Sequence, residues 1–347
     1  MGCHAYVFDP LYLEHDLPGH PENRTRLDII LQALRDEGLL PRLTLLQPRP
    51  VSRALLERVH QPGYVTAVQA MAARGGGYLD PDTYVTPRSF EAALLAAGGV
   101  VELVHAVLDG RADNGIALIR PPGHHATPAR GMGFCLFNNV ALGAQAALER
   151  GLTRILIVDW DVHHGNGTQE IFYRSPQVLY FSTHQYPHYP GTGHWREVGE
   201  GPGRGFTVNV PLPAGVGDQG FARIFAELLT PLARRFQPEV ILVSAGYDAH
   251  WSDPLAGLRL SLAGYWRMAQ GVVNLAQELC QGRLVVALEG GYNLAILGRA
   301  VADTCRALLG DKEPGPDPLG PCPWAEQPAD NLIQAVAALH GLQDEGA

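Results

Sequence analysis

Short apolar runs alternate with longer segments of helical spacing through most of this 347-residue chain. The runs 155–158 and 240–243 contain only aliphatic residues, which is typical of strands buried on both faces of a parallel sheet. Other runs with the composition of strands cover residues 5–8, 43–46, 115–119, 178–181, 206–210 and 284–288. After residue 115, each strand except 206–210 ends in polar or glycine-rich sequence. We therefore expect these strand ends to form one polar rim.

Segments with helical spacing separate the strands. The expected helices cover residues 27–40, 54–59, 64–73, 90–108, 138–150, 168–173, 221–236, 265–280, 294–309 and 329–342. The segments expected as loops are 10–26, 80–84, 185–205 and the proline-rich 314–328. Alternating strand and helix predicts an α/β fold, with helices on both faces of a parallel sheet. Without a charged or low-complexity linker, we predict one domain over 1–347, with its core at 5–310 and a C-terminal extension at 311–347.

Composition and charge narrow the function classes. The formal net charge of −9 argues against nonspecific binding to nucleic acid or to anionic membranes, and it is compatible with cationic ligands. The five cysteines are odd in number and widely spaced, which argues against a disulfide framework and against a cysteine-type zinc site. The N-terminus does not resemble a signal peptide. No apolar run approaches the ~20 residues of a spanning helix. We expect a cytoplasmic protein.

Asp161, His163 and Asp248 are candidate ligands for a metal ion. Asp161 and His163 follow the strand 155–158 two residues apart, so in extended chain their side chains point to the same side. Asp248 follows the strand 240–244, and ligands of open α/β sheets bind beyond the carboxyl ends of strands. Two carboxylates and one imidazole suit Zn²⁺ and would also accept Fe²⁺ or Co²⁺. Taken alone, each residue is more typical of a cap at a turn or strand end than of a metal ligand.

His124 and His125 are candidates for general acid and base catalysis. They follow a Pro-Pro-Gly turn, so we interpret them as two imidazoles at one site rather than as a helix face. Asp159 could orient one imidazole and Asn166 the other. Because an amide lacks the negative charge of a carboxylate, the two histidines should differ in pKa. The alternative is a solvated pair of histidines in a loop.

Tyr292 is a candidate oxyanion donor. It follows Gly290 and Gly291, whose backbone freedom lets a loop approach closely. A tyrosine hydroxyl directed at the substrate carbonyl would stabilise the negative charge that develops when water attacks. A core tyrosine with a satisfied hydroxyl is the alternative interpretation.

Five motifs, spread over roughly residues 15 to 310, resemble those of the histone deacetylase superfamily in their sequences and in their order along the chain. They are Arg120-Pro-Pro-Gly-His-His-Ala, Gly133-Phe134-Cys-Leu-Phe-Asn-Asn, Asp159-Trp-Asp-Val-His-His-Gly-Asn-Gly-Thr-Gln, Ser244-Ala-Gly-Tyr-Asp-Ala-His and Leu288-Glu-Gly-Gly-Tyr. That superfamily includes class I and II deacetylases, acetylpolyamine amidohydrolases and bacterial acetoin-utilization deacetylases. Asn166 is similar to class II members, whereas class I carries Asp at this position.

The resemblance implies the arginase/deacetylase fold, with an eight-stranded parallel sheet flanked by helices, and a zinc-dependent deacetylase activity. It implies that zinc is held by Asp161, His163 and Asp248. It implies His125 as the principal general base and acid, and His124 paired with Asp159. Tyr292 matches the oxyanion tyrosine that some class IIa members replace, so its presence favours catalysis.

The resemblance also implies a potassium ion near the zinc. The expected ligands are the side chains of Asp159 and Ser182 and the main chain of Asp161, His163 and Thr183. A second, outer K⁺ site would lie near Phe172, Ser175 and Val178.

Four residues match substrate-binding positions of the family. Phe134 and Tyr189 match the aromatic tunnel walls, although Phe is usual at the second position, and Gly133 matches the residue whose carbonyl meets the substrate amide. Leu255 stands where polyamine deacetylases carry a gatekeeper Glu, which favours an acetylated lysine of a protein or peptide, or a neutral acyl amide. An acetylpolyamine or another small acetylated amine remains the alternative substrate.

A catalytically inactive acyl-lysine binding module is less favoured because no site residue is missing. An arginase-like ureohydrolase would need more bridging carboxylates, and the oligomeric state stays open.

Overall fold

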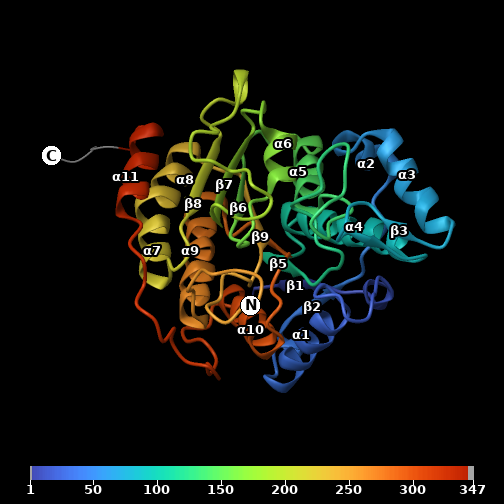
Figure 1. Cartoon of the computed structure of the whole chain (residues 1–347), viewed down its shortest axis with the longest axis horizontal. Helices are drawn as coiled ribbons and strands as arrows, with labels where there is room; N and C mark the ends of the chain where they lie inside the picture. The colour runs from blue at the N-terminus through green and yellow to red at the C-terminus, as the bar shows by residue number, and fades with distance from the viewer. Residues whose placement is uncertain (1, 343–347) are drawn as a thin grey trace.

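The computed structural model describes residues 2–342, so the ends of the predicted domain lie outside the described residues. Its main element is an eight-stranded parallel sheet in the order β2-β1-β5-β10-β9-β6-β7-β8 (Figure 1). In that order the strands are β2 (Thr44–Leu46), β1 (His4–Val7), β5 (Asn114–Ala117), β10 (Leu284–Leu288), β9 (Val240–Ala245), β6 (Ile155–Asp159), β7 (Val178–Gln185) and β8 (Thr207–Leu212). The predicted fold class and strand number are confirmed.

Helices cover both faces of the sheet, as predicted (Figure 1). One layer contains α2 (Arg53–Val59), α3 (Pro62–Ala73), α4 (Ser89–Leu108), α5 (Asn139–Glu149) and α6 (Asn166–Phe172). The other contains α1 (Thr25–Asp36), α7 (Asp218–Ile224), α8 (Thr230–Phe236), α9 (Leu262–Cys280), α10 (Leu294–Leu308) and α11 (Asp330–Leu339). Strands β5, β6, β9 and β10 are buried along their whole length between the layers, which explains the nearly unbroken apolar sequences of β6, β9 and β10.

The four central strands position the polar motifs. Strands β5, β10, β9 and β6 are consecutive neighbours in the sheet. Because they are parallel, the segments that follow them emerge at the same edge. These four segments contain the tandem histidines after β5, the glycine-tyrosine loop after β10, Asp248 after β9, and Asp161 with His163 after β6. Motifs that are far apart in sequence therefore meet over the centre of the sheet.

Local predictions needed correction at three places. The predicted loop 10–26 begins with a 3₁₀ helix at Pro10–Glu14, where Pro10 starts the helix and the Asp9 side chain caps it. The loop 80–84 joins a short antiparallel ribbon formed by β3 (Gly77–Tyr78) and β4 (Tyr84–Val85). The single helix predicted over 221–236 is instead α7 and α8 joined by a π-helical turn at Phe225–Leu229.

Helix α4 also corrects an expectation. By length and composition it could cross a membrane, with a mean hydropathy of 1.7 over its most apolar window, although we expected no such segment. However, 67% of that window is buried inside the fold. The helix packs against α5, β5 and β10, so its apolar sequence serves the core of the domain.

Candidate metal centre and active site

Asp161, His163 and Asp248 come together at the carboxyl edge of the sheet. One potential ligand atom from each residue lies within 4.8 Å of the other two. His163 Nδ1 is 3.1 Å from Asp161 Oδ1 and 3.3 Å from Asp248 Oδ2. Asp248 Oδ2 is buried and lacks a hydrogen-bond partner among residues 2–342. A buried carboxylate oxygen without a donor is costly unless a cation or a proton satisfies it.

The electrostatics of this cluster favour a cation. Burial opposes charge on His163, but the carboxylates of Asp161 and Asp248 outweigh burial and raise the pKa of this imidazole to about 10. Burial and the charge of Asp161 raise the pKa of Asp248. One imidazole and two carboxylates are a ligand set of catalytic zinc sites, which keep a further position open. The three side chains therefore fit zinc.

Backbone groups orient both carboxylates. Val162 N–H donates to Asp248 Oδ1 at 3.0 Å, and Gly290 N–H donates to Asp161 Oδ2 at 2.8 Å. A side chain at position 290 would overlap both carboxylates, so the close approach requires glycine there. Hydrogen bonds of this kind hold metal ligands in one orientation.

The tandem histidines have different partners, as predicted. His124 Nδ1 lies 3.1 Å from Asp159 Oδ2, and His125 Nδ1 lies 2.8 Å from Asn166 Oδ1. Burial lowers the pKa of His124, but Asp159 and Asp161 outweigh it and raise the value to about 10. Burial and the neighbouring His124 hold the pKa of His125 well below its usual value. The site thus keeps one imidazole protonated and the other neutral.

A cavity of about 370 Å³ leads to these side chains. Its lining includes the tandem histidines, two of the candidate metal ligands and the four predicted substrate-binding residues, together with Tyr292: His124, His125, Asp161, His163, Gly133, Phe134, Tyr189, Leu255 and Tyr292. The other predicted site residues do not line it, and Asn166 lines a separate surface pocket; these residues are Asp159, Asn166, Ser182, Thr183 and Asp248. Asp80, Asp82 and His188 also line it, and nothing in their local sequence predicted this.

Aromatic rings form the walls of the cavity. Phe134 packs edge-to-face against Tyr292, with ring centroids 5.8 Å apart. Its φ is +70°, and its N–H donates to Thr83 Oγ1 at 3.0 Å, which holds this unusual backbone conformation. Tyr189 packs edge-to-face against His125 at 5.2 Å. The cavity is therefore a largely apolar slot that ends at the polar cluster.

Comparisons with known proteins agree with this geometry. Residues 20–308 match the histone deacetylase domain. The chain is 46% identical over 291 residues to a probable deacetylase of Archaeoglobus fulgidus, covering 83% of this chain and 81% of that protein. The chain belongs to the histone deacetylase family. It is also 43% identical to the human polyamine deacetylase HDAC10, over 91% of this chain and 48% of that protein. The crystal structure of the HDA15 HD domain superposes with a TM-score of 0.89 at 38% identity, covering 98% of this chain and 94% of that one.

The histone deacetylase family consists of deacetylases and amidohydrolases, so the chain is a hydrolase of this class.

The residues expected to bind potassium lie next to the metal cluster. Asp159 and Ser182 are register partners on β6 and β7, and Thr183 Oγ1 donates to the Asp159 carbonyl at 3.4 Å. Ser182 Oγ also contacts His184 Nδ1 at 2.9 Å. The outer site falls where α6 meets β7, and Ser175 N–H there donates to the Phe172 carbonyl, shortly before Val178. Potassium at either place stays a prediction.

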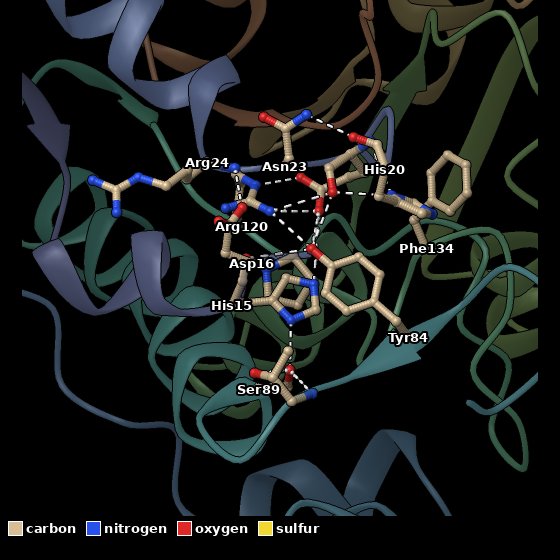
Figure 2. A network of polar contacts seen from close by, with 12 residues as sticks. His15, Asp16, His20, Asn23, Arg24, Tyr84, Ser89, Arg120 and Phe134 are labelled. Atoms are coloured by element: carbon tan, nitrogen blue, oxygen red, sulfur yellow. Dashed lines mark hydrogen bonds and ion pairs between the residues drawn. The ribbon is translucent and has the colours of Figure 1, made fainter. Parts of the chain in front are cut away.

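A buried ionic network that no motif predicted lies beside this site (Figure 2). Glu22 and Arg120 are both fully buried and form an ion pair, in which Arg120 Nη2 donates to Glu22 Oε2 at 2.7 Å. Tyr84 and Arg120 also share a hydrogen bond of 3.1 Å, and His15 stacks on the Tyr84 ring. Figure 2 shows this network extending through His20 to Phe134, on the cavity wall. The sequence feature that could have indicated this network is a charged residue next to proline, which occurs in two motifs, His20-Pro-Glu22 and Arg120-Pro-Pro.

Arg26 and Glu289 were also missed. Glu289 Oε2 accepts hydrogen bonds from the Gly123 N–H at 2.7 Å and the His124 N–H at 3.2 Å, which fixes the turn before the tandem histidines. The Arg26 guanidinium donates to the carbonyls of residues 289 and 291, and it lies 5.1 Å from the Tyr292 ring centroid. Arg26 was predicted to end the loop 10–26, whereas it lies in the first turn of α1, and no local pattern indicated this role.

Proposed function

We propose that this chain removes acetyl or other short acyl groups from the lysine side-chain amine of peptides or proteins, with zinc as its cofactor. One observation carries the proposal: a cluster of one imidazole and two carboxylates lies at the end of a largely apolar slot, beside one protonated and one neutral histidine. A slot of this shape admits the extended side chain of an acyl-lysine and keeps its backbone outside. A K⁺ ion near Asp159 and Ser182 and a cytoplasmic location belong to the same proposal.

Asp161, His163 and Asp248 would hold the zinc. When bound, zinc would polarise the acyl carbonyl and lower the pKa of the attacking water. His125 is neutral, so it can accept the proton of that water and then return it to the leaving lysine amine. His124 keeps its proton because of Asp159, and it contributes positive charge beside the reacting atoms.

Tyr292 would complete the site. Burial holds the pKa of its hydroxyl well above the usual value, so the group stays protonated at neutral pH. It can then donate a hydrogen bond to the acyl oxygen as negative charge develops there. The apolar walls formed by Phe134 and Tyr189 exclude bulk water, which strengthens that hydrogen bond. The products are a free lysine amine and a carboxylic acid.

Steady-state rates on a panel of acyl-lysine peptides test this function. The panel contains acetyl-, propionyl- and butyryl-lysine in one peptide sequence, and each assay is repeated after chelation and after zinc is returned. We expect hydrolysis of at least one peptide, its loss on chelation and its recovery with zinc. Undiminished hydrolysis by protein shown to be free of metal would contradict the proposal.

A second candidate function is deacetylation of an acetylpolyamine. The carboxylates of Asp80 and Asp82 lie at the cavity, where they could attract the second ammonium group of such a substrate, and one relative in the family is named a polyamine deacetylase. Leu255, which also lines the cavity, cannot attract that group. Acetylspermidine in the same panel separates the two functions. A higher kcat/KM for it than for every peptide would favour this second function.

A further inference from the structure

Asp253 is a buried carboxylate that holds two backbone segments of the active-site cavity. Its Oδ1 accepts a hydrogen bond from the Leu255 N–H at 3.0 Å. Its Oδ2 accepts two more, from the N–H of Tyr292 at 2.7 Å and that of Asn293 at 3.0 Å. The residue is only 6% exposed, and burial and the charge of Asp248 raise its pKa to about 7, whereas its three N–H donors favour the ionised carboxylate. Asp253 thus joins one wall of the cavity to the loop that contains Tyr292.

Side chains hold much of the backbone of residues 289–293. Arg26 donates to two carbonyls of this segment, at 2.5 and 2.8 Å, and Asp161 accepts from one of its N–H groups at 2.8 Å. These contacts fix the part of the loop before Tyr292. Asp253 fixes the N–H of Tyr292 itself and the N–H that follows it. Asp253 therefore fixes the backbone from which the tyrosine side chain projects, while Arg26 and Phe134 contact the ring itself.

The neighbouring residues support the same connection from outside the cavity. Asn293 Nδ2 donates to the Ser252 carbonyl at 2.9 Å and contacts Ser252 Oγ at 2.6 Å. The other amide atom, Asn293 Oδ1, accepts from the Ala295 N–H at 3.0 Å and caps α10. Two consecutive residues, Ser252 and Asp253, thus bind the two residues that lead into α10.

We propose that Asp253 is a positioning residue, which aims the Tyr292 hydroxyl at the reacting acyl oxygen and holds Leu255 in the cavity wall. The inference rests on the proposed function, in which Tyr292 stabilises the developing charge. An oxyanion donor contributes only from the correct position, and a displacement of about 1 Å can cost about 100-fold in rate. Asp253 does not line the cavity and acts through Tyr292 and Leu255.

Two substitutions of Asp253 should lower kcat to different extents. Asp253→Ala removes all three acceptor contacts, whereas Asp253→Asn keeps the shape of the side chain but places an NH₂ group against at least one N–H donor. We expect kcat on an acetyl-lysine peptide to fall about 10- to 100-fold for Asp253→Ala and by a smaller factor for Asp253→Asn. Zinc content and the midpoint of thermal unfolding, measured for each variant, identify protein that has not folded.

A double-mutant cycle with Tyr292→Phe gives the decisive measurement. If Asp253 acts through the Tyr292 hydroxyl, Asp253→Ala should lower kcat less than about threefold once that hydroxyl is absent. Losses that multiply in the double variant would overturn the inference. If Tyr292→Phe alone keeps wild-type kcat, the oxyanion role in the proposed function fails, and the catalytic part of this inference is overturned with it.

Hydrogen exchange of the metal-free proteins adds a readout independent of activity. Peptides covering residues 289–293 should exchange faster in Asp253→Ala than in wild type, and unchanged exchange would overturn the inference. Glu239→Ala is the matched control, because Glu239 Oε2 likewise accepts two consecutive backbone N–H groups, from Thr153 at 2.8 Å and Arg154 at 2.9 Å. That carboxylate lies at the opposite edge of the sheet, so its loss should leave kcat within twofold of wild type.

Discussion

At the scale of single residues, Asn166 and Asp159 give the tandem histidines different charge states. The two rings are close, with centroids 4.0 Å apart, and both are buried. Only His124 has a carboxylate on Nδ1, and that negative charge compensates for burial. The amide of Asn166 fixes the orientation of the His125 ring but adds no charge. The difference between the carboxylate of Asp159 and the amide of Asn166 therefore decides which histidine can accept a proton.

Asn166→Asp should move the acidic limb of the pH profile to higher pH. Burial holds the pKa of His125 well below its usual value, and a carboxylate on Nδ1 would raise it. Because the general base must be neutral, activity is lost as pH falls through its pKa, so a higher pKa means loss at higher pH. We expect a shift of about one pH unit or more in kcat/KM on an acetyl-lysine peptide, measured from pH 5 to 9.

Asn114→Asp is the matched control for that profile. Asn114 Oδ1 also contacts a histidine, His4 Nδ1, at 2.9 Å, but it lies at the start of β5, at the opposite edge of the sheet. The acidic limb of this variant should coincide with that of wild type. A wild-type limb in Asn166→Asp would mean that His125 is not the group that titrates.

At the scale of elements, the Glu22–Arg120 pair fixes the segment before α1 against the turn after β5. Burial raises the pKa of Glu22, but Arg120 and Arg26 outweigh it and lower the value to about 2, so the carboxylate is charged. A buried ion pair contributes little over an apolar pair, whereas removing one partner leaves an uncompensated charge. The turn held by Arg120 continues directly into the tandem histidines. The network therefore supports the position of His124 from outside the cavity.

Glu22→Gln should destabilise the fold by about 3–5 kcal/mol, because two buried guanidinium groups lose their counter-charge. Urea unfolding at pH 7 measures the change in the free energy of unfolding. The control is Asp311→Asn, which breaks an exposed pair with Arg42 and should cost less than about 1 kcal/mol. A loss for Glu22→Gln as small as that of the control would show that the network is not an ionic unit.

How far the sequence predicted these elements depends on whether the signal was local. The central strands β6, β9 and β10 were predictable because each is a buried apolar run, and α10 was predictable from apolar spacing that begins after Asn293. The metal cluster was predictable because Asp161 and His163 follow one strand and Asp248 follows another at the same edge. The ion pair of Glu22 with Arg120 joins residues 98 apart, and no local pattern indicates which buried charges will meet.

The cavity shows the same limit. Tyr189 and Phe134 were assigned to its walls through the family resemblance, and both line it. Asp80 and Asp82 were expected only to form a loop, and they reach the cavity because the β3–β4 ribbon turns that loop toward it. The sequence pattern assigned no role to Asp253. Its three N–H donors come from segments that only the completed sheet brings together.

At the scale of the whole molecule, buried neutral histidines link stability to pH. Burial is the main cause that lowers the pKa of five of them, to about 3 for His15 and to about 4 for the others, which are His60, His184, His250 and His340. In the unfolded chain each should titrate near pH 6.5. Between these values the unfolded chain binds more protons than the folded one. Their stabilising contribution is therefore complete above pH 6.5 and is lost as pH falls toward 4.

We expect the free energy of unfolding to drop by several kcal/mol between pH 7 and pH 5, since each such histidine can account for roughly 2 kcal/mol at pH 5 as an upper limit. Urea unfolding at the two pH values measures the drop.

His340→Leu isolates one contribution, because His340 lies on the C-terminal side of α11, and its Nε2 is buried without a hydrogen-bond partner among residues 2–342. Leucine can fill this place without losing a hydrogen bond, so the variant should fold as stably as wild type at pH 7. It should then lose about 2 kcal/mol less than wild type on acidification to pH 5, and an equal loss in both proteins would exclude His340 from the acid response.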